Sequence, residues 1–448
     1  MTAVDTQATQ AMAMNASGRT KRAALGRRIR PRAWLGVLGL LGLHALAAPA
    51  AELGASVESL LELARTRNPE LAAMQHEAAA AASRVGPAGA LPDPVLRVEL
   101  MNINNYGNDA GPNLLPSKVG ETKYTLMQSL PLWGKRELRH DAAAADAQQA
   151  EARTDATWVE LAARIKAAYA EYYGAVGNER LAAEVLGLMT RLEQVAQVRY
   201  AGGLAGPSDA IRAQLEQTAV RAELIALDSE KRQIRAKLNA LLARDGAATL
   251  AEPKALRPVP SLVSADAAAL AERARARNPQ LLAELARVAA AQNNRDLTRR
   301  NRYPDLTLGV SPSQMGSRIT TWGVMVEMNI PLQQASRRSQ EREAESMIAA
   351  ARSRAEALSQ QLIGELAVNL AGLDAARRTE TLLKTQLLPQ SELGLQSALA
   401  AYENGRAEFG MLLEAQRQIR KARQEILQSQ VDAQMRLAEI ERILGEDL

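Results

Sequence analysis

The feature that most constrains this chain is an internal duplication. Asn68-Pro69-Glu70-Leu71 returns 210 residues later as Asn278-Pro279-Gln280-Leu281. Further anchors return in the same order: Leu130-Pro131-Leu132 as Ile330-Pro331-Leu332, and Tyr200 and Gly203 as Tyr402 and Gly405. Alanine-rich helices can resemble one another, but that resemblance does not explain prolines and glycines in a shared order. The chain is therefore predicted to fold as two copies of one unit.

The two copies predict the domain organisation. We expect a leader over 1–50, a first repeat over 51–252, a proline-rich linker over 253–263 and a second repeat over 264–448. Each repeat should hold short helices, two strands, one very long helix and a final helix. The expected ranges are strands near 94–103, 121–132, 305–311 and 318–331, and helices over 135–200, 209–243, 333–402 and 408–444.

The helices should be long and packed as coiled coils. Aromatic residues make up only 3 % of the chain, whereas alanine, leucine, glutamate and arginine abound, which is typical of long helices rather than globular cores. No proline lies between Pro131 and Pro207, so one helix can extend for about 100 Å at about 1.5 Å per residue. Leu181, Val185, Leu188, Leu192 and Val195 step by four and three residues, as in a coiled-coil seam. The predicted fold class is mainly α with a small β part.

The strand-like runs alternate between apolar and polar residues. From Trp322 to Ile330 every second residue is apolar, and Leu96 to Leu100 alternates in the same way. Such alternation is typical of a transmembrane barrel strand, but a soluble half-buried sheet alternates identically. In a barrel, the lumen candidates are Arg97, Glu99, Thr321, Met325, Glu327 and Asn329. Four strands cannot close a barrel, so two subunits would supply eight strands or three would supply twelve.

The net charge of +5 belongs to the leader. The first 50 residues hold seven basic side chains and one acid, so 48 basic and 49 acidic residues remain in the rest of the chain. A basic segment, an apolar run of about 13 residues from Trp34 and a small-residue string predict a secretory signal, cleaved near Ala50. This distribution argues against a nucleic-acid partner.

The residue inventory argues against an enzyme. There is no cysteine, and His44, His76 and His140 are the only histidines, so a thiolate, zinc or catalytic-triad centre is hard to assemble. We predict no catalytic residues, no cofactor and no resident metal. Several methionines, among them Met127 and Met325, lie near the strands; they are either packing residues or contacts for a soft metal.

These residues resemble a known family. The repeat, the Asn-Pro openings, the turns Ala201-Gly202-Gly203-Leu204 and Glu403-Asn404-Gly405-Arg406, and the run Gln128–Arg136 are similar to the TolC-type outer-membrane efflux channels, in particular their heavy-metal (CusC/CzcC) branch. The resemblance implies a homotrimer, with a 12-stranded transmembrane barrel shared by three subunits above a long coiled-coil barrel in the periplasm. It also implies a periplasmic adaptor (membrane fusion protein) and an inner-membrane RND pump as partners, with the channel a passive conduit.

The resemblance also implies where the sites lie. Gly202, Gly203, Leu204, Gly405 and Arg406 would form the periplasmic tip that meets the adaptor. Glu408, Glu414 and Asp209 are the gate candidates, although acids at a helix start are also favoured simply by the helix dipole. The cargo would be heavy-metal cations, such as Cu/Ag or Co/Zn/Cd, and organic compounds are the alternative with the same fold. A soluble periplasmic coiled-coil scaffold is the remaining alternative.

Overall fold

The computed structural model describes residues 52–103, 112–203, 206–260 and 266–448. All of them belong to one compact unit, Ala51–Leu448. The expected leader, the tip residue Leu204 and part of the expected linker lie outside the described residues.

The two repeats have the same order of elements. The first contains α1 (Val57–Arg67), α2 (Pro69–Gly89), β1 (Val95–Met101), β2 (Glu121–Leu130), α3 (Lys135–Ala201) and α4 (Pro207–Leu241). The second contains α5 (Ala267–Arg277), α6 (Pro279–Arg300), β3 (Leu306–Met315), β4 (Arg318–Met328), α7 (Gln334–Leu382), a π-helical segment (Leu383–Leu387), α8 (Leu388–Glu403) and α9 (Phe409–Leu444). Within the described part of the chain, no helix carries an apolar stretch long enough to cross a bilayer.

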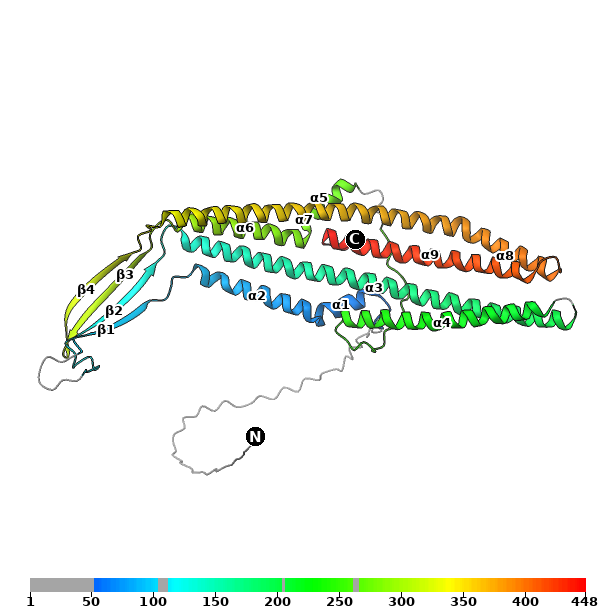
Figure 1. Ribbon diagram of the computed structural model, residues 1–448, viewed down its shortest axis with the longest axis horizontal. Helices are drawn as coiled ribbons and strands as arrows, with labels where there is room; N and C mark the ends of the chain where they lie inside the picture. Colours follow the sequence, from blue (N-terminus) through cyan, green and yellow to red (C-terminus); the bar gives the residue numbers. More distant parts are fainter. Residues whose placement is uncertain (1–51, 104–111, 204–205, 261–265) are drawn as a thin grey trace, which may run out of the picture. The chain divides into compact units, whose positions relative to one another are not determined.

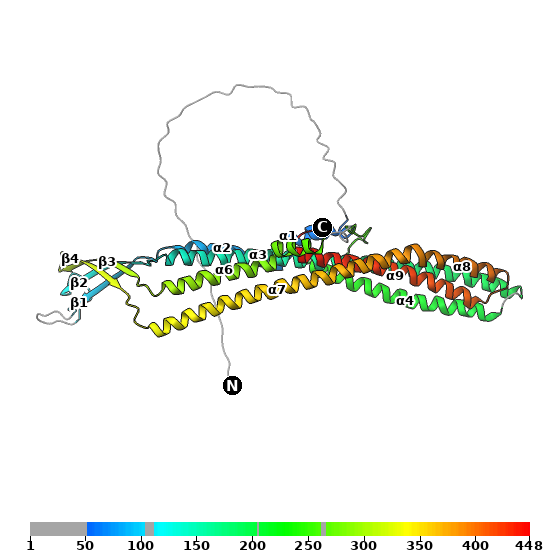
Figure 2. The same ribbon diagram turned by 90° about the horizontal axis from the view of Figure 1, so that it is seen from above.

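The four strands form one antiparallel sheet in the order β1-β2-β3-β4. The sheet lies at one end of the helices (Figure 1). Helices α2, α3, α6 and α7 lie side by side next to it, in the same order as the strands to which they connect. At the opposite end, α3 packs on α4 and α8 packs on α9, while α3 and α9 join the two pairs (Figure 2). The strand order thus continues directly into the helix layer.

Each Asn-Pro pair joins two helices end to end. The Oδ1 of Asn68 accepts hydrogen bonds from the N–H groups of Glu70 and Leu71, and its Nδ2 donates to the carbonyl of Leu241, the last residue of α4. In the second repeat Asn278 Oδ1 accepts from Leu281 N–H, and its Nδ2 donates to Ile443 O near the end of α9, at 2.9 Å. One side chain therefore satisfies a free donor at one helix start and a free acceptor at another helix end.

The two repeats differ in the residue that terminates the last helix. Gly445 follows α9 with φ +72°, and a Cβ there would lie 2.8 Å from the carbonyl oxygen of Arg277. The corresponding position after α4 is Ala243, which adopts φ +53°. Left-handed backbone favours glycine, so the first repeat is strained where the second is relaxed.

A buried polar network fastens the linker to both repeats. The Tyr169 hydroxyl lies 3.0 Å from Ala55 O and 3.1 Å from Ala255 O, and its one hydrogen is shared between these two carbonyls. Nearby, Glu441 is only 3 % exposed and accepts from Lys166 Nζ at 2.7 Å. Its two carboxylate oxygens also receive both Nη groups of Arg257, each at 3.0 Å. Because every buried charge here has an opposite partner, the linker is held without an uncompensated ion.

The long helix expected over 333–402 is interrupted. The π-helical segment Leu383–Leu387 separates α7 from α8, and Pro389 lies in the first turn of α8. Proline supplies no N–H for the carbonyl four residues earlier and its ring collides with that carbonyl. A wider turn before Pro389 relieves this conflict, whereas α3 has no internal proline and is continuous.

Candidate functional site: the sheet faces and the helical tip

One face of the sheet is apolar and exposed. Leu96, Leu126, Val310 and Val324 pair across all four strands in a single row. Their exposed fractions run from 47 % to 82 %, and Trp322, two residues from Val324 along β4, is 69 % exposed. A contiguous apolar sheet face of this extent is unusual for a soluble monomer and marks a surface that meets lipid or another protein.

The opposite face carries the expected lumen residues. Glu99, Lys123, Ser313 and Thr321 form one row across the four strands. Arg97, Met325 and Glu327 lie at even spacing along β1 and β4 from members of this row, so they belong to the same face. The Nη1 atom of Arg97 lies 3.9 Å from Oε1 of Glu99, and both side chains are well exposed. Asn329 follows the end of β4, where its N–H donates to Asp305 O at 3.4 Å.

Two methionines meet on this polar face. Gly309 pairs with both Met127 and Met325. A Cβ on Gly309 would lie 3.0 Å from Met325 Cε and 3.3 Å from Met127 Cγ, so the missing side chain makes room for both thioethers. Sequence reasoning placed both methionines near the strands but did not pair them, because the pairing depends on the β2–β3–β4 register.

At the other end of the helices, two hairpin turns form the tip. The first passes through Gly202 and Gly203, the latter with φ +71°, and the second passes through Gly405 with φ +70°. Apart from its chain neighbours, no described residue has an atom within 4 Å of a Cβ built on Gly203. Arg406 is exposed beside Gly405. The two turns are positive-φ reversals of the kind that glycine allows.

A polar contact joins the two hairpins. The Tyr402 ring, on α8, packs edge-on against Phe409 of α9, with ring centroids 5.6 Å apart. The hydroxyl of Tyr402 donates to Asp209 Oδ2 of α4 at 3.3 Å. The guanidinium of Arg199 lies 4.8 Å from the centre of the Tyr402 ring, and its Nη1 donates to Glu403 O at 2.9 Å. Asp209, Tyr402 and Arg199 together form what we call the tip latch.

The latch explains the shift in acidity of its tyrosine. Burial raises the pKa of Tyr402 above its ordinary value, and the negative charge of Asp209 raises it further, while Arg199 opposes both effects. The hydroxyl therefore remains a donor to Asp209 throughout the neutral pH range.

The structure separates the three gate candidates. Asp209 lies in the latch, whereas Glu408 and Glu414 are exposed on α9. Glu408 is the N-cap residue of α9 but its side chain caps no N–H group. The sequence did not reveal Tyr402 as the partner of Asp209, because 193 residues separate the two.

Ion pairs between helices extend up from the tip. Arg417 on α9 bonds Glu216 on α4 at 2.9 Å, and one turn further Arg420 pairs with Glu223. The hydrogen bonds that Arg417 donates to Glu216 raise the pKa of Arg417, with a lesser contribution from the charge of Glu414. These pairs link α9 to α4 through their side chains.

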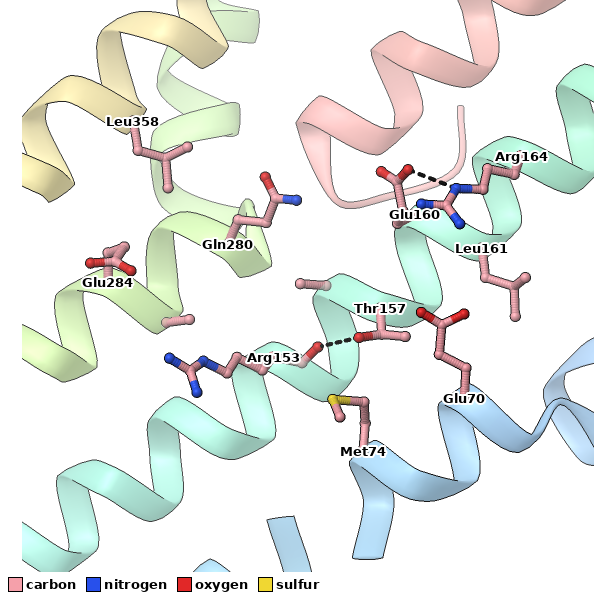
Figure 3. A pocket seen from close by; sticks show the side chains of 12 residues that line it. Glu70, Met74, Arg153, Thr157, Glu160, Leu161, Arg164, Gln280, Glu284 and Leu358 are labelled. Atoms are coloured by element: carbon pink, nitrogen blue, oxygen red, sulfur yellow. Dashed lines mark hydrogen bonds and ion pairs between the residues drawn. The ribbon is translucent and has the colours of Figure 1, made fainter. Parts of the chain in front are cut away.

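A pocket of about 460 Å³ lies between α2, α3, α6 and α7 (Figure 3). Its lining mixes charges, and Glu160 receives Arg164 Nε at 2.9 Å. Glu70 and Met74 reach it from α2, and Glu284 from α6. Across the described ranges, no three histidine or carboxylate side chains come together as a metal site.

The chain matches known proteins over most of its length. Residues 60–244 and 270–446 match the family described as outer membrane efflux protein. The cobalt-zinc-cadmium resistance protein CzcC of Cupriavidus metallidurans is 24 % identical over 401 residues, which cover 87 % of this chain and 90 % of CzcC. The outer membrane protein VceC of Vibrio cholerae matches with a TM-score of 0.73 and 20 % identity, over 87 % of this chain and 96 % of VceC. CusC matches with a TM-score of 0.74 and 17 % identity, over 87 % of this chain and 92 % of CusC. The TolC-like fold expected from the sequence is confirmed.

Proposed function

Because this chain belongs to the outer membrane efflux protein family, we propose that it is the exit conduit of a tripartite, RND-type efflux system. In this proposal three copies form the channel, a periplasmic adaptor meets the helical tip, and an inner-membrane pump supplies the energy. The leader over 1–50 exports the chain and is then removed.

The observation that carries the proposal is the two-faced sheet. Its apolar face suits contact with lipid, and its other face carries charged and hydroxyl side chains suited to water. A sheet of four strands has two open edges, whose backbone N–H and C=O groups find no hydrogen-bond partners in lipid. A membrane-spanning structure must therefore be a closed barrel to which several subunits contribute strands. Three copies give twelve strands, enough for a water-filled bore.

We propose divalent heavy-metal cations as the cargo. The similarity to CzcC, a cobalt-zinc-cadmium resistance protein, covers most of both chains. Exposed carboxylates near the tip suit cations, because three copies around an axis turn one carboxylate into a ring whose field acts on ions in a narrow bore. Glu408 and Glu414 are the proposed ring residues, and Asp209 acts through the tip latch instead.

The test of function is a deletion strain of the source bacterium. We expect loss of the gene to raise sensitivity to cobalt, zinc and cadmium and to raise their content in the cell. Wild-type chain should restore tolerance, whereas Gly405→Asp should not, because it places a charge at the proposed adaptor contact. Gly405→Asn is the matched control, since asparagine has the same shape and accepts positive φ without the charge. Sensitivity to organic compounds alone would replace metals with the alternative cargo, and no phenotype in either panel would refute the efflux role.

The gate is tested in planar bilayers. Glu414→Ala should lower the preference for cations over anions, measured as the reversal potential under asymmetric salt. Glu425→Ala, on the same helix but farther from the tip, should leave the reversal potential unchanged. Equal behaviour of wild type and Glu414→Ala would remove this residue from the gate.

A further inference from the structure

An open groove lies where the sheet meets the helices. We call it the junction groove: it is lined by Trp133 and Glu137 near the start of α3, Arg300 and Tyr303 at the end of α6, and Glu341 of α7. Its volume is about 790 Å³ and its lining is largely polar. Leu130 and Leu306, the last paired residues of β2 and β3 on this side, each lie three residues from the groove aromatics. The groove therefore begins where the apolar rows of the sheet end.

The two aromatic residues indicate the level of the groove relative to a membrane. The rings of Trp133 and Tyr303 lie 5.2 Å apart, and Trp133 Nε1 donates to Pro304 O at 3.0 Å. Both side chains keep a large exposed surface, 50 % for Trp133 and 41 % for Tyr303. Tryptophan and tyrosine with one apolar and one wet side are enriched at the headgroup level of membranes. The pair therefore indicates that the groove lies at the level of lipid headgroups.

Most charges around the groove already have partners. Arg302 pairs with Glu341 and Arg299 pairs with Glu345, so α7 is fastened to the end of α6. Two groove residues are left over. Arg300 and Glu137 are exposed, and the side chain of neither makes a hydrogen bond or ion pair with any described residue, nor with that of the other. The groove thus offers one unpaired cation and one unpaired anion, held apart on different helices.

We propose that the junction groove binds the headgroup of a zwitterionic glycerophospholipid with a primary ammonium, that is, a phosphatidylethanolamine. The phosphate is received by the guanidinium of Arg300, which can donate two parallel hydrogen bonds, and the ammonium is received by Glu137. The acyl chains then extend along the apolar rows of the sheet. This inference rests on the proposed function, since it requires the sheet to lie in the membrane.

The same charges disfavour other lipids. A phosphatidylglycerol headgroup satisfies Arg300 but leaves Glu137 facing an anion. A phosphatidylcholine headgroup presents a trimethylated nitrogen, which donates no hydrogen bond to Glu137. The expected order is therefore phosphatidylethanolamine first, with the other two weaker.

The test is native mass spectrometry of the purified full-length protein, delipidated and then incubated with each lipid in turn. We expect one retained phosphatidylethanolamine per protomer, bound roughly tenfold more tightly than phosphatidylglycerol or phosphatidylcholine, since charged hydrogen bonds contribute on this scale. Arg300→Gln should abolish retention of all three. Glu137→Gln should remove the preference for phosphatidylethanolamine over phosphatidylglycerol. Arg338→Gln is the matched control, because Arg338 is an exposed arginine of α7 outside the groove and should leave retention unchanged.

The outcomes separate the two proposals. Equal retention of the three lipids by an intact trimer, or an equal effect of Arg338→Gln, would overturn the lipid site and leave the efflux conduit standing. A chain that forms no detergent-resistant trimer and stays out of the membrane fraction would overturn the proposed function itself.

Discussion

Replacing Asn278 by alanine should uncouple α6 from α9. The side chain is 1 % exposed and makes two hydrogen bonds of 2.9 Å, one accepted from Leu281 N–H and one donated to Ile443 O. Loss of an N-cap side chain costs about 1 kcal/mol, and leaving a buried carbonyl without its donor costs about 1–3 kcal/mol. We therefore expect Asn278→Ala to lower the free energy of local unfolding by about 2–4 kcal/mol.

The assay is hydrogen exchange of the purified protein, followed at the first turn of α6 and the last turn of α9. A loss of about 2–4 kcal/mol should accelerate exchange in both segments by roughly 30-fold to 1000-fold. Asn278→Asp separates the two roles, because its carboxylate still accepts from Leu281 N–H but no longer donates to Ile443 O. In that variant, the start of α6 should remain protected while the end of α9 exchanges faster.

The repeat supplies an internal comparison. Asn68 makes the same pair of contacts with α2 and α4, but it is 7 % exposed and its bond to Leu241 O is only partly buried. The partly buried carbonyl can be solvated in part after the change, so Asn68→Ala should accelerate exchange less than Asn278→Ala. Acceleration below about threefold at both ends of the Asn278→Ala junction would refute the reasoning.

Three further predictions concern strain, pH and the sheet faces. Ala243→Gly should raise the free energy of unfolding by about 1 kcal/mol, because alanine adopts φ +53° there. Gly445→Ala should lower the free energy of unfolding. Thermal unfolding in detergent measures the change in each variant. Burial raises the pKa of Tyr169 from 10.0 to about 12. The stability contributed by its neutral hydroxyl is therefore complete below pH 10 and is lost as the pH rises through 12. When tyrosinate absorbance is followed in an alkaline titration, the last step of the wild-type curve should be missing in Tyr169→Phe. Val324→Lys, on the apolar face, should cost about 2–4 kcal/mol and reduce assembly in the outer membrane, while Thr321→Lys, on the opposite face, should assemble; equal assembly of the two variants would contradict the face assignment.

Patterns within one segment allowed part of this structure to be predicted. Alternation along β4 placed Thr321, Met325 and Glu327 together on one face, as the register confirms. The duplication showed that Asn68 and Asn278 are equivalent positions. Each of these inferences needs only neighbours along the chain or a comparison of the two copies.

Contacts between distant segments could not be predicted in this way. The bonds from Asn68 to Leu241 and from Asn278 to Ile443 span 173 and 165 residues, and no local pattern specifies them. The latch between Tyr402 and Asp209 joins the two repeats, so comparing the repeats with each other does not reveal it. Val195 shows a second limit: it continues the predicted seam of α3 by spacing but is 43 % exposed, whereas the next residue, Ala196, is fully buried. A step of three and a step of four both fit a coiled-coil seam, so spacing alone does not decide between them.

The break between α7 and α8 shows why a constant helical period does not predict the buried residues along the whole of this segment. Buried residues before and after the break follow a spacing of seven: Leu366 and Leu373 on α7, and Ser391 and Ala398 on α8. Across the break the spacing is eight, from Leu383 to Ser391. In a continuous α-helix the extra residue would rotate everything after it by about 100°, since 3.6 residues make one turn. The wider turn of the π-helical segment absorbs that residue, so Ala398 and then Tyr402 still face the bundle interior. The position of Tyr402 in the tip latch therefore depends on an irregular turn some fifteen residues away, which a search for constant periodicity treats as a mismatch.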